Sequence, residues 1–388
     1  MRRRTLTLWV TLFGLLSGSG LAETPSSETL VGTEAIQAAP EPLAQWHDVI
    51  RQTPYWISQG VHENLRTIRL WVLTNRGYCE QPERHILFDV RATFQGYLNN
   101  GEDTDATQRQ LNELRAALAA DGTLEAWVPG SRGVTGYPLA LSCDQPDARL
   151  QAALDRYTGA DSEAMFWGTW DGMQVGSADN RVSLHEAIKI VYQTRREQGR
   201  IELPEEVLST LAGKVIIESG GLSNAHSAAN ARGIMQLTPA ALGDCEIAER
   251  FHFHRIAQID CAMRLLEQNH RNLYPTFEDQ FGHLPEDKAE HLYNLLLLQA
   301  YHGGVGRVRA LMTDDELRGA ADYFAHHHEQ FSAGDIALGM VFHNLGRNFL
   351  GTASLYYLVD VSIASEAACS ALSDLAGCEP FTAPDADT

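Results

Sequence analysis

The fold prediction for this chain rests on one run of residues, Glu218-Ser219-Gly220-Gly221-Leu222-Ser223-Asn224-Ala225-His226-Ser227-Ala228-Ala229-Asn230-Ala231-Arg232-Gly233-Ile234-Met235-Gln236. Apolar residues recur at helical spacing over residues 205–218, and Gly220 and Gly221 can adopt the positive φ that ends a helix. The carboxyl group of Glu218 is thus expected at the end of a helix. The apolar residues 215–217 beside it reduce its contact with water, which favours the protonated form that can act as an acid.

Helix signals dominate the rest of the chain. Thr238 can cap a helix, and Pro239 is tolerated at the first helical position because its missing N–H would have no partner there. No alternating strand pattern matches this signal, and glycines interrupt any pattern between about residues 158 and 184, which indicates a domain boundary. Helical spacing also covers residues 64–73, 83–98, 107–120, 184–196, 255–270, 287–301, 314–331, 335–345 and 352–372.

A resemblance to a known family follows from two motifs. The run at 218–236 resembles the signature of soluble lytic transglycosylases, in which Glu-Ser-Gly precedes Ala-x-Ser and then Gly-Ala-x-Gly-Leu-Met-Gln. The later box Ala-Tyr-His-Gly-Gly-Val-Gly-Arg-Val at 300–308 is similar to the family's Ala-Tyr-Asn-Ala-Gly-Pro-Gly-Arg-Val. The resemblance covers roughly residues 184–370 and implies an all-α, goose-type lysozyme-like catalytic domain over 184–388. A mostly helical amino-terminal domain of unknown role is expected before it, over 43–183.

The resemblance also implies an activity. Glu218 would be the only catalytic carboxylate, acting first as an acid and then as a base. The reaction would cleave the β-1,4 bond between MurNAc and GlcNAc in peptidoglycan glycan strands and close a 1,6-anhydro ring on MurNAc, with no cofactor and no metal ion. The residues implied to bind the substrate are Ser227, Met235, Gln236, Tyr301, His302 and Tyr357.

Three positions depart from the family pattern. Asn230 replaces a glycine expected to have positive φ, and asparagine is the ordinary residue best able to adopt that conformation. His302 replaces an asparagine and can donate or accept a hydrogen bond. The final family tyrosine has two candidates; Tyr357 fits better than Tyr356 because the residue four positions on is apolar, and core packing is the alternative for both.

Two other functions share these features. A goose-type lysozyme would use the same glutamate and fold but would activate a water molecule and hydrolyse the bond. A catalytically silent peptidoglycan-binding scaffold would hold glycan without turnover, and its amino-terminal domain would recruit cell-envelope proteins. The products released from cell-wall sacculi separate these hypotheses.

The amino terminus predicts export. Arginines at 2–4 precede an apolar stretch over 6–16, and small residues lead to a cleavage site near Ala22, so residues 1–22 form a predicted signal peptide and the mature protein is expected in the periplasm. That stretch is shorter than the roughly 20 residues needed to span a bilayer, so no stable membrane anchor is expected. Residues 23–42, rich in Ala, Pro, Ser, Thr and Glu, are predicted to be a flexible linker.

The charge of the chain restricts its possible ligands, and its cysteine content predicts disulfide bonds. The 388 residues include 50 acidic and 30 basic side chains, a formal charge of −20 that repels phosphate backbones and makes nucleic acid an unlikely ligand. Six cysteines in an exported chain suggest disulfides, and none of the proposed pairs has the Cys-x-x-Cys spacing of a metal site. Proximity in sequence favours the pairs Cys245–Cys261 and Cys369–Cys378, which leaves Cys79 for Cys143.

Overall fold

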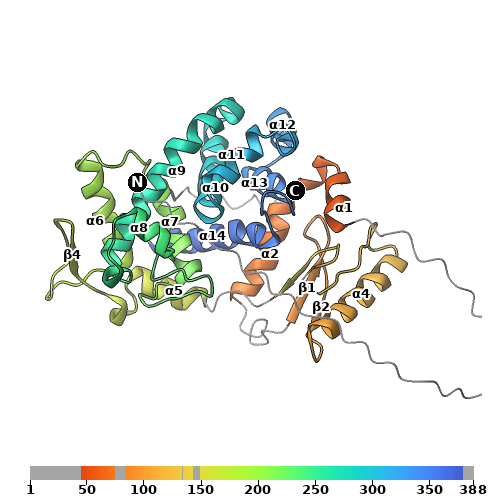
Figure 1. The fold of residues 1–388 in the computed structure, drawn as a ribbon, viewed down its shortest axis with the longest axis horizontal. Coiled ribbons are helices and arrows are strands. Elements are labelled where there is room, and N and C mark those ends of the chain that lie inside the picture. Colours follow the sequence, from red (N-terminus) through yellow and green to blue (C-terminus); the bar gives the residue numbers. More distant parts are fainter. Residues whose placement is uncertain (1–44, 75–83, 133, 143–148, 379–388) are drawn as a thin grey trace, which may run out of the picture. The chain divides into compact units, whose positions relative to one another are not determined.

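The computed structural model describes residues 45–74, 84–132, 134–142 and 149–378, which are mostly helical (Figure 1). Contacts group these described residues into one compact unit. The predicted signal peptide and linker, as well as Cys79 and Cys143, lie outside the described residues. The predicted disulfides Cys245–Cys261 and Cys369–Cys378 are both confirmed.

The first part of the chain combines helices with two small sheets. In the larger sheet the strand order is β2-β1-β3, both pairings are antiparallel, and Ile86 at the centre pairs with Tyr97 on one side and Leu141 on the other. The elements are α1 (Trp46–Gln52), η1 (Tyr55–Ser58), α2 (Val61–Thr74), β1 (Arg84–Phe88), β2 (Phe94–Asn99), α4 (Thr104–Ala120), β3 (Ala140–Ser142), α5 (Leu150–Thr158), η2 (Ser162–Ala164), β4 (Gly168–Trp170) and β5 (Met173–Val175).

Although the described residues are mostly helical as expected and all the strands lie before residue 184, the predicted helix over residues 83–98 is wrong. Those residues form β1 and β2, joined by a turn in which the Asp89 carboxylate accepts hydrogen bonds from the backbone N–H groups of Arg91 and Thr93, each at 2.9 Å. The cause is the central position of β1. Three consecutive buried residues at 86–88 hide the alternation that usually identifies a strand.

The second part is helical almost throughout, and the helices predicted over 184–196, 205–218, 287–301 and 352–372 are confirmed to within a few residues. Thr238 caps its helix through a hydrogen bond from the Ala241 N–H at 3.2 Å. The elements are α6 (Leu184–Glu197), α7 (Val207–Ser219), α8 (Pro239–Asp244), η3 (Glu249–Phe251), α9 (Arg255–Phe281), α10 (Glu286–Gly303), α11 (Val305–Thr313), α12 (Gly319–His326), η4 (His328–Gln330), α13 (Ala333–Phe342) and α14 (Thr352–Ala371).

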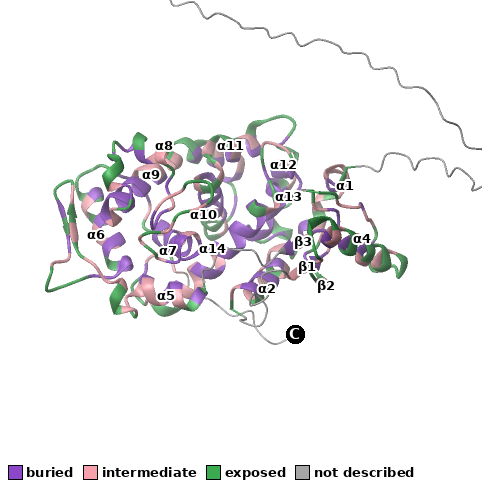
Figure 2. Cartoon of the chain, turned by 60° about the horizontal axis from the view of Figure 1, so that its bottom comes forward, coloured by how far each residue is buried: buried purple, intermediate pink, exposed green. Residues whose placement is uncertain are grey.

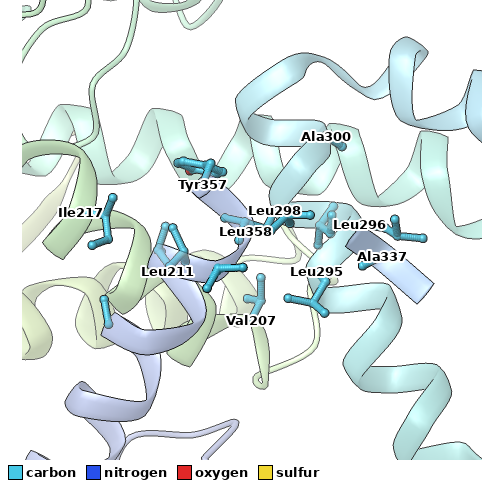
Figure 3. Close-up of a cluster of buried hydrophobic side chains, with 14 of the residues drawn as sticks. Val207, Leu211, Ile217, Leu295, Leu296, Leu298, Ala300, Ala337, Tyr357 and Leu358 are labelled. Atoms are coloured by element: carbon cyan, nitrogen blue, oxygen red, sulfur yellow. The ribbon is translucent and has the colours of Figure 1, made fainter. Parts of the chain in front are cut away.

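Helices α7, α10 and α14 form the centre of the core. Both α7 and α14 are buried nearly all round, as their apolar sequences require (Figure 2). Gly213 of α7 lets the two helices approach closely, because a Cβ atom there would collide with the Val361 carbonyl and with Ser365 Oγ. Apolar side chains of all three helices meet in one cluster that includes Leu211, Leu298 and Leu358 (Figure 3).

A buried ion pair joins the two parts of the chain. Arg69 of α2 donates from Nε and Nη2 to the two carboxylate oxygens of Asp360 on α14, each at 2.6 Å, and at most 2% of either side chain is exposed. Burial raises the pKa of Asp360, and the Arg69 charge opposes that rise. The boundary predicted between residues 183 and 184 stays a prediction, but contacts cross it at this pair.

Across the described ranges, every helix is too short or too polar to cross a lipid bilayer.

We predict that Arg69→Met lowers the free energy of unfolding at pH 7 by about 3–5 kcal/mol, because it leaves the Asp360 carboxylate buried without a counter-charge. The loss should shrink as the pH falls, since the unpaired carboxyl has a raised pKa in the folded state and is protonated first there. Urea unfolding at pH 7 and pH 4.5 measures both effects.

The matched control is Arg66→Met, one turn earlier in α2, which removes a partly exposed pair with Glu366 and should cost about 1 kcal/mol or less. Equal losses for the two variants at pH 7 would contradict the importance assigned to the Arg69–Asp360 pair.

Candidate active site

Glu218 lies in the last turn of α7, as the sequence predicts. Gly220 and Gly221 follow with φ of 58° and 74°, so the helix ends in the left-handed conformation that glycine adopts without strain. Arg156 of α5 donates a hydrogen bond to the Gly220 carbonyl and supports this turn. The Glu218 side chain is mostly buried but keeps 21% of its surface exposed.

The chain then folds back on itself over residues 222–237. Asn230 has φ of 62°, which confirms the positive φ expected at this position. The Ser227 hydroxyl accepts a hydrogen bond from the Ala231 N–H at 3.0 Å, and Gln236 donates its side-chain amide to the Gly233 carbonyl at 2.8 Å. In this structure both side chains stabilise the backbone of the loop.

Gln258 of α9 is the main support of this loop. Its amide is fully buried, accepts from the Met235 N–H at 3.0 Å and donates to the Arg232 carbonyl at 2.7 Å and to the His252 carbonyl. A Cβ atom at Gly233 would collide with this amide, which explains the glycine. One side chain thereby fixes three segments of the loop and its flank.

Lys214 lies one turn before Glu218 on the same helix, and only 2% of its side chain is exposed. Its Nζ donates to the Met235 carbonyl at 2.9 Å, lies 3.7 Å from Glu218 Oε1, and lies 4.2 Å from the centre of the Tyr301 ring. Met235 itself has no exposed surface, so its side chain packs in the core and its carbonyl oxygen is what it contributes to this site.

Two phenol groups face the same carboxyl group. Tyr301 comes from α10 and Tyr357 from α14, and within the described part of the chain neither hydroxyl makes a hydrogen bond of ordinary geometry. Burial raises the pKa of both hydroxyls, and the negative charge of Glu218 raises it further. Tyr356 instead packs against Phe88 and lies beneath the Arg69 guanidinium, away from this site.

His302 stacks on Tyr357, with ring centres 4.0 Å apart and planes 20° apart. Loss of water around the His302 ring lowers the pKa of His302, although part of the residue stays exposed. The Glu218 charge raises this pKa, whereas the Lys214 charge lowers it further. His302 is therefore neutral near pH 7. The structure thus brings Glu218, Tyr301, His302 and Tyr357 together from three helices.

Residues 196–324 match the family model described as the transglycosylase SLT domain. This part of the chain is similar to the transglycosylase SLT domain. The match confirms the resemblance drawn from the two motifs, and it includes every predicted site residue except Tyr357, which lies beyond its end. No curated protein matches the chain.

Sequence reasoning missed two residues of the SLT domain that the structure places at this site. Lys214 carried a usable signal, because residues four apart on a helix face each other and Glu218 is four positions on. Gln258 carried none, since a single glutamine within a long helix gives no indication of which loop it contacts.

The site contains several groups that can transfer or accept a proton. One ammonium group, one imidazole and two phenols lie around the Glu218 carboxyl group. Across the ranges that the structure describes, no three His, Cys, Asp or Glu side chains are grouped so that they could hold a metal ion.

We predict that Gln258→Leu loosens the loop after Glu218, because the buried Met235 N–H would lose its partner and the Arg232 carbonyl would keep only the hydrogen bond from the Leu237 N–H. The expected cost is about 1–3 kcal/mol in the free energy of unfolding, with faster hydrogen exchange at the Met235 amide. Exchange measured by NMR or mass spectrometry tests this.

Gln280→Leu is the control on the same helix, since Gln280 makes one partly exposed hydrogen bond to Asp322 at 3.1 Å. If the Met235 amide exchanges equally fast in both variants, the role assigned to Gln258 is wrong.

Proposed function

We propose that this protein is a peptidoglycan lytic transglycosylase that cleaves the β-1,4 bond between MurNAc and GlcNAc and leaves a 1,6-anhydro-MurNAc end. The observation that carries the proposal is the solitary position of Glu218. Among the described residues, it is the only carboxylate whose charge acts on Lys214, Tyr301, His302 or Tyr357. The SLT domain match supports a peptidoglycan substrate.

A single carboxylate restricts the mechanism. Most glycosidases use two carboxyl groups, one to protonate the leaving oxygen and one to act as nucleophile or base. In the proposed reaction, Glu218 gives its proton to the glycosidic oxygen while the N-acetyl oxygen of MurNAc attacks C1 and expels the GlcNAc 4-hydroxyl.

The same carboxylate then serves as the base. It removes the proton from the MurNAc 6-hydroxyl, whose oxygen attacks C1, displaces the N-acetyl oxygen and closes the anhydro ring. Glu218 ends the cycle protonated, and no water is consumed. Because the attacking hydroxyl belongs to the bound sugar, its effective concentration is very high, which removes the need for an activated water.

We also propose that the protein works in the periplasm after removal of a signal peptide near Ala22. The disulfides Cys245–Cys261 and Cys369–Cys378 support an oxidising compartment, since such bonds are rare where thiols are kept reduced.

We predict that Glu218→Gln reduces turnover of purified sacculi by at least about 10²-fold while fold and glycan binding persist, because the amide keeps the shape of the side chain but cannot transfer a proton. Glu205→Gln, at an exposed position before the other end of α7, is the control and should remain active. Mass spectrometry of the released fragments provides the measurement.

Anhydro ends from the wild-type protein support the proposal. Fragments heavier by one water would identify a lysozyme-type hydrolase instead. A wild-type protein that binds sacculi but releases nothing would identify a silent scaffold.

A further inference from the structure

Lys214 is a charged group in a place that disfavours charge. Its side chain is 2% exposed and extends from α7, whose residues 211–217 are all buried. Removing an ammonium group from water costs several kcal/mol unless neighbouring groups compensate. A lysine is therefore expected here only if its surroundings stabilise the charge.

The surroundings supply that compensation from three sides. The Met235 carbonyl accepts a hydrogen bond from Nζ at 2.9 Å, the Tyr301 ring presents its face at 4.2 Å, and Glu218 Oε1 lies at 3.7 Å. The carbonyl and the ring are neutral, so Glu218 is the partner that carries a full opposite charge. Burial lowers the pKa of Lys214, and Glu218 opposes that fall.

The other titratable groups around Glu218 are neutral near pH 7. They are Tyr301 and His302 on α10 and Tyr357 on α14, and burial disfavours the charged form of each. The α7 face contributes Lys214, and the loop contributes only the Met235 backbone carbonyl. Among the described residues of this cluster, Lys214 is thus the positively charged group that faces Glu218.

We propose that Lys214 is a positioning residue that stabilises the Glu218 carboxylate formed when the proton leaves for the glycosidic oxygen. This inference rests on the proposed function. The ammonium group lies 3.7 Å from Glu218 Oε1 and attracts the negative charge that forms there, and its hydrogen bond to the Met235 carbonyl keeps it at a fixed place beside the carboxylate.

The sign of the effect follows from the charge. Removing a nearby positive charge raises the pKa of a carboxyl group. The value of kcat/KM falls above the pKa of the group that must be protonated. In Lys214→Met, the pH at which kcat/KM begins to fall should therefore be higher by about 1–2 pH units. At low pH, where Glu218 is protonated in both proteins, the variant should be slower because its acid is weaker.

The experiment compares Lys214→Met and Lys214→Arg with the wild-type protein. Methionine has a similar length without charge, and arginine keeps the charge, so only the methionine variant should raise the pH at which kcat/KM begins to fall. Lys189→Met is the matched control, because Lys189 pairs at 2.7 Å with Asp374, whose side chain is largely exposed, outside this cluster. The probe is a soluble glycan of alternating GlcNAc and MurNAc, and kcat/KM is followed from pH 4 to 8.

A second measurement does not depend on turnover. Carbon-13 NMR of labelled glutamate gives the pKa of Glu218 directly, and nitrogen-15 NMR of labelled lysine gives that of Lys214. Lys214→Met should raise the Glu218 pKa, and Glu218→Gln should lower the Lys214 pKa by the reciprocal effect. The second variant keeps the measurement possible if Lys214→Met fails to fold.

The outcomes separate the two proposals. An unchanged Lys214 pKa in Glu218→Gln, or an unchanged pH dependence of kcat/KM and an unchanged Glu218 pKa in folded Lys214→Met, overturns the role of Lys214 as counter-charge. Shifted pKa values in a wild-type protein that forms no anhydro product would overturn the proposed function and leave the pairing of Lys214 with Glu218 supported.

Discussion

The close approach of α7 and α14 at Gly213 determines where the groups of the site lie. With no side chain at this position, α7 rests directly on the Val361 carbonyl and Ser365 of α14. The helices run in opposite directions, so Glu218, beyond Gly213, meets Tyr357, which precedes Val361. Any side chain at 213 would separate the helices and with them the carboxyl group and the phenol.

Tyr357 belongs to the apolar cluster formed by α7, α10 and α14 (Figure 3), and Tyr301 packs against that cluster. Low polarity strengthens every electrostatic interaction there, which is why one ammonium group and one carboxylate affect each other and the aromatic residues around them. Lys214 and Met235 also connect the helix that carries Glu218 to the loop that follows it. The geometry of the acid is thus coupled to the conformation of the loop.

Local sequence chemistry predicted the end of α7, the position of Glu218 on it and the positive φ of Asn230, because each depends on a few neighbouring residues. Local sequence patterns did not predict the features that depend on contacts between residues far apart in the sequence. Residues 84–99 form strands because a third strand pairs from beyond residue 139, and Gln258 acquires its role only when α9 packs beneath the loop. The sequence also could not predict that Met235 is buried, since burial depends on the whole fold.

Helix α14 brings together residues that are far apart in the sequence. Because α14 carries both Tyr357 and Asp360, its contacts with α7 and with Arg69 of α2 join residues separated by well over a hundred positions. Such contacts form late, since the loop entropy must be overcome first. A chain emerging from a ribosome or a translocation pore therefore has no assembled site until its residues beyond about 360 are free. The order of the helices along the chain therefore delays assembly of the site until α14 has emerged.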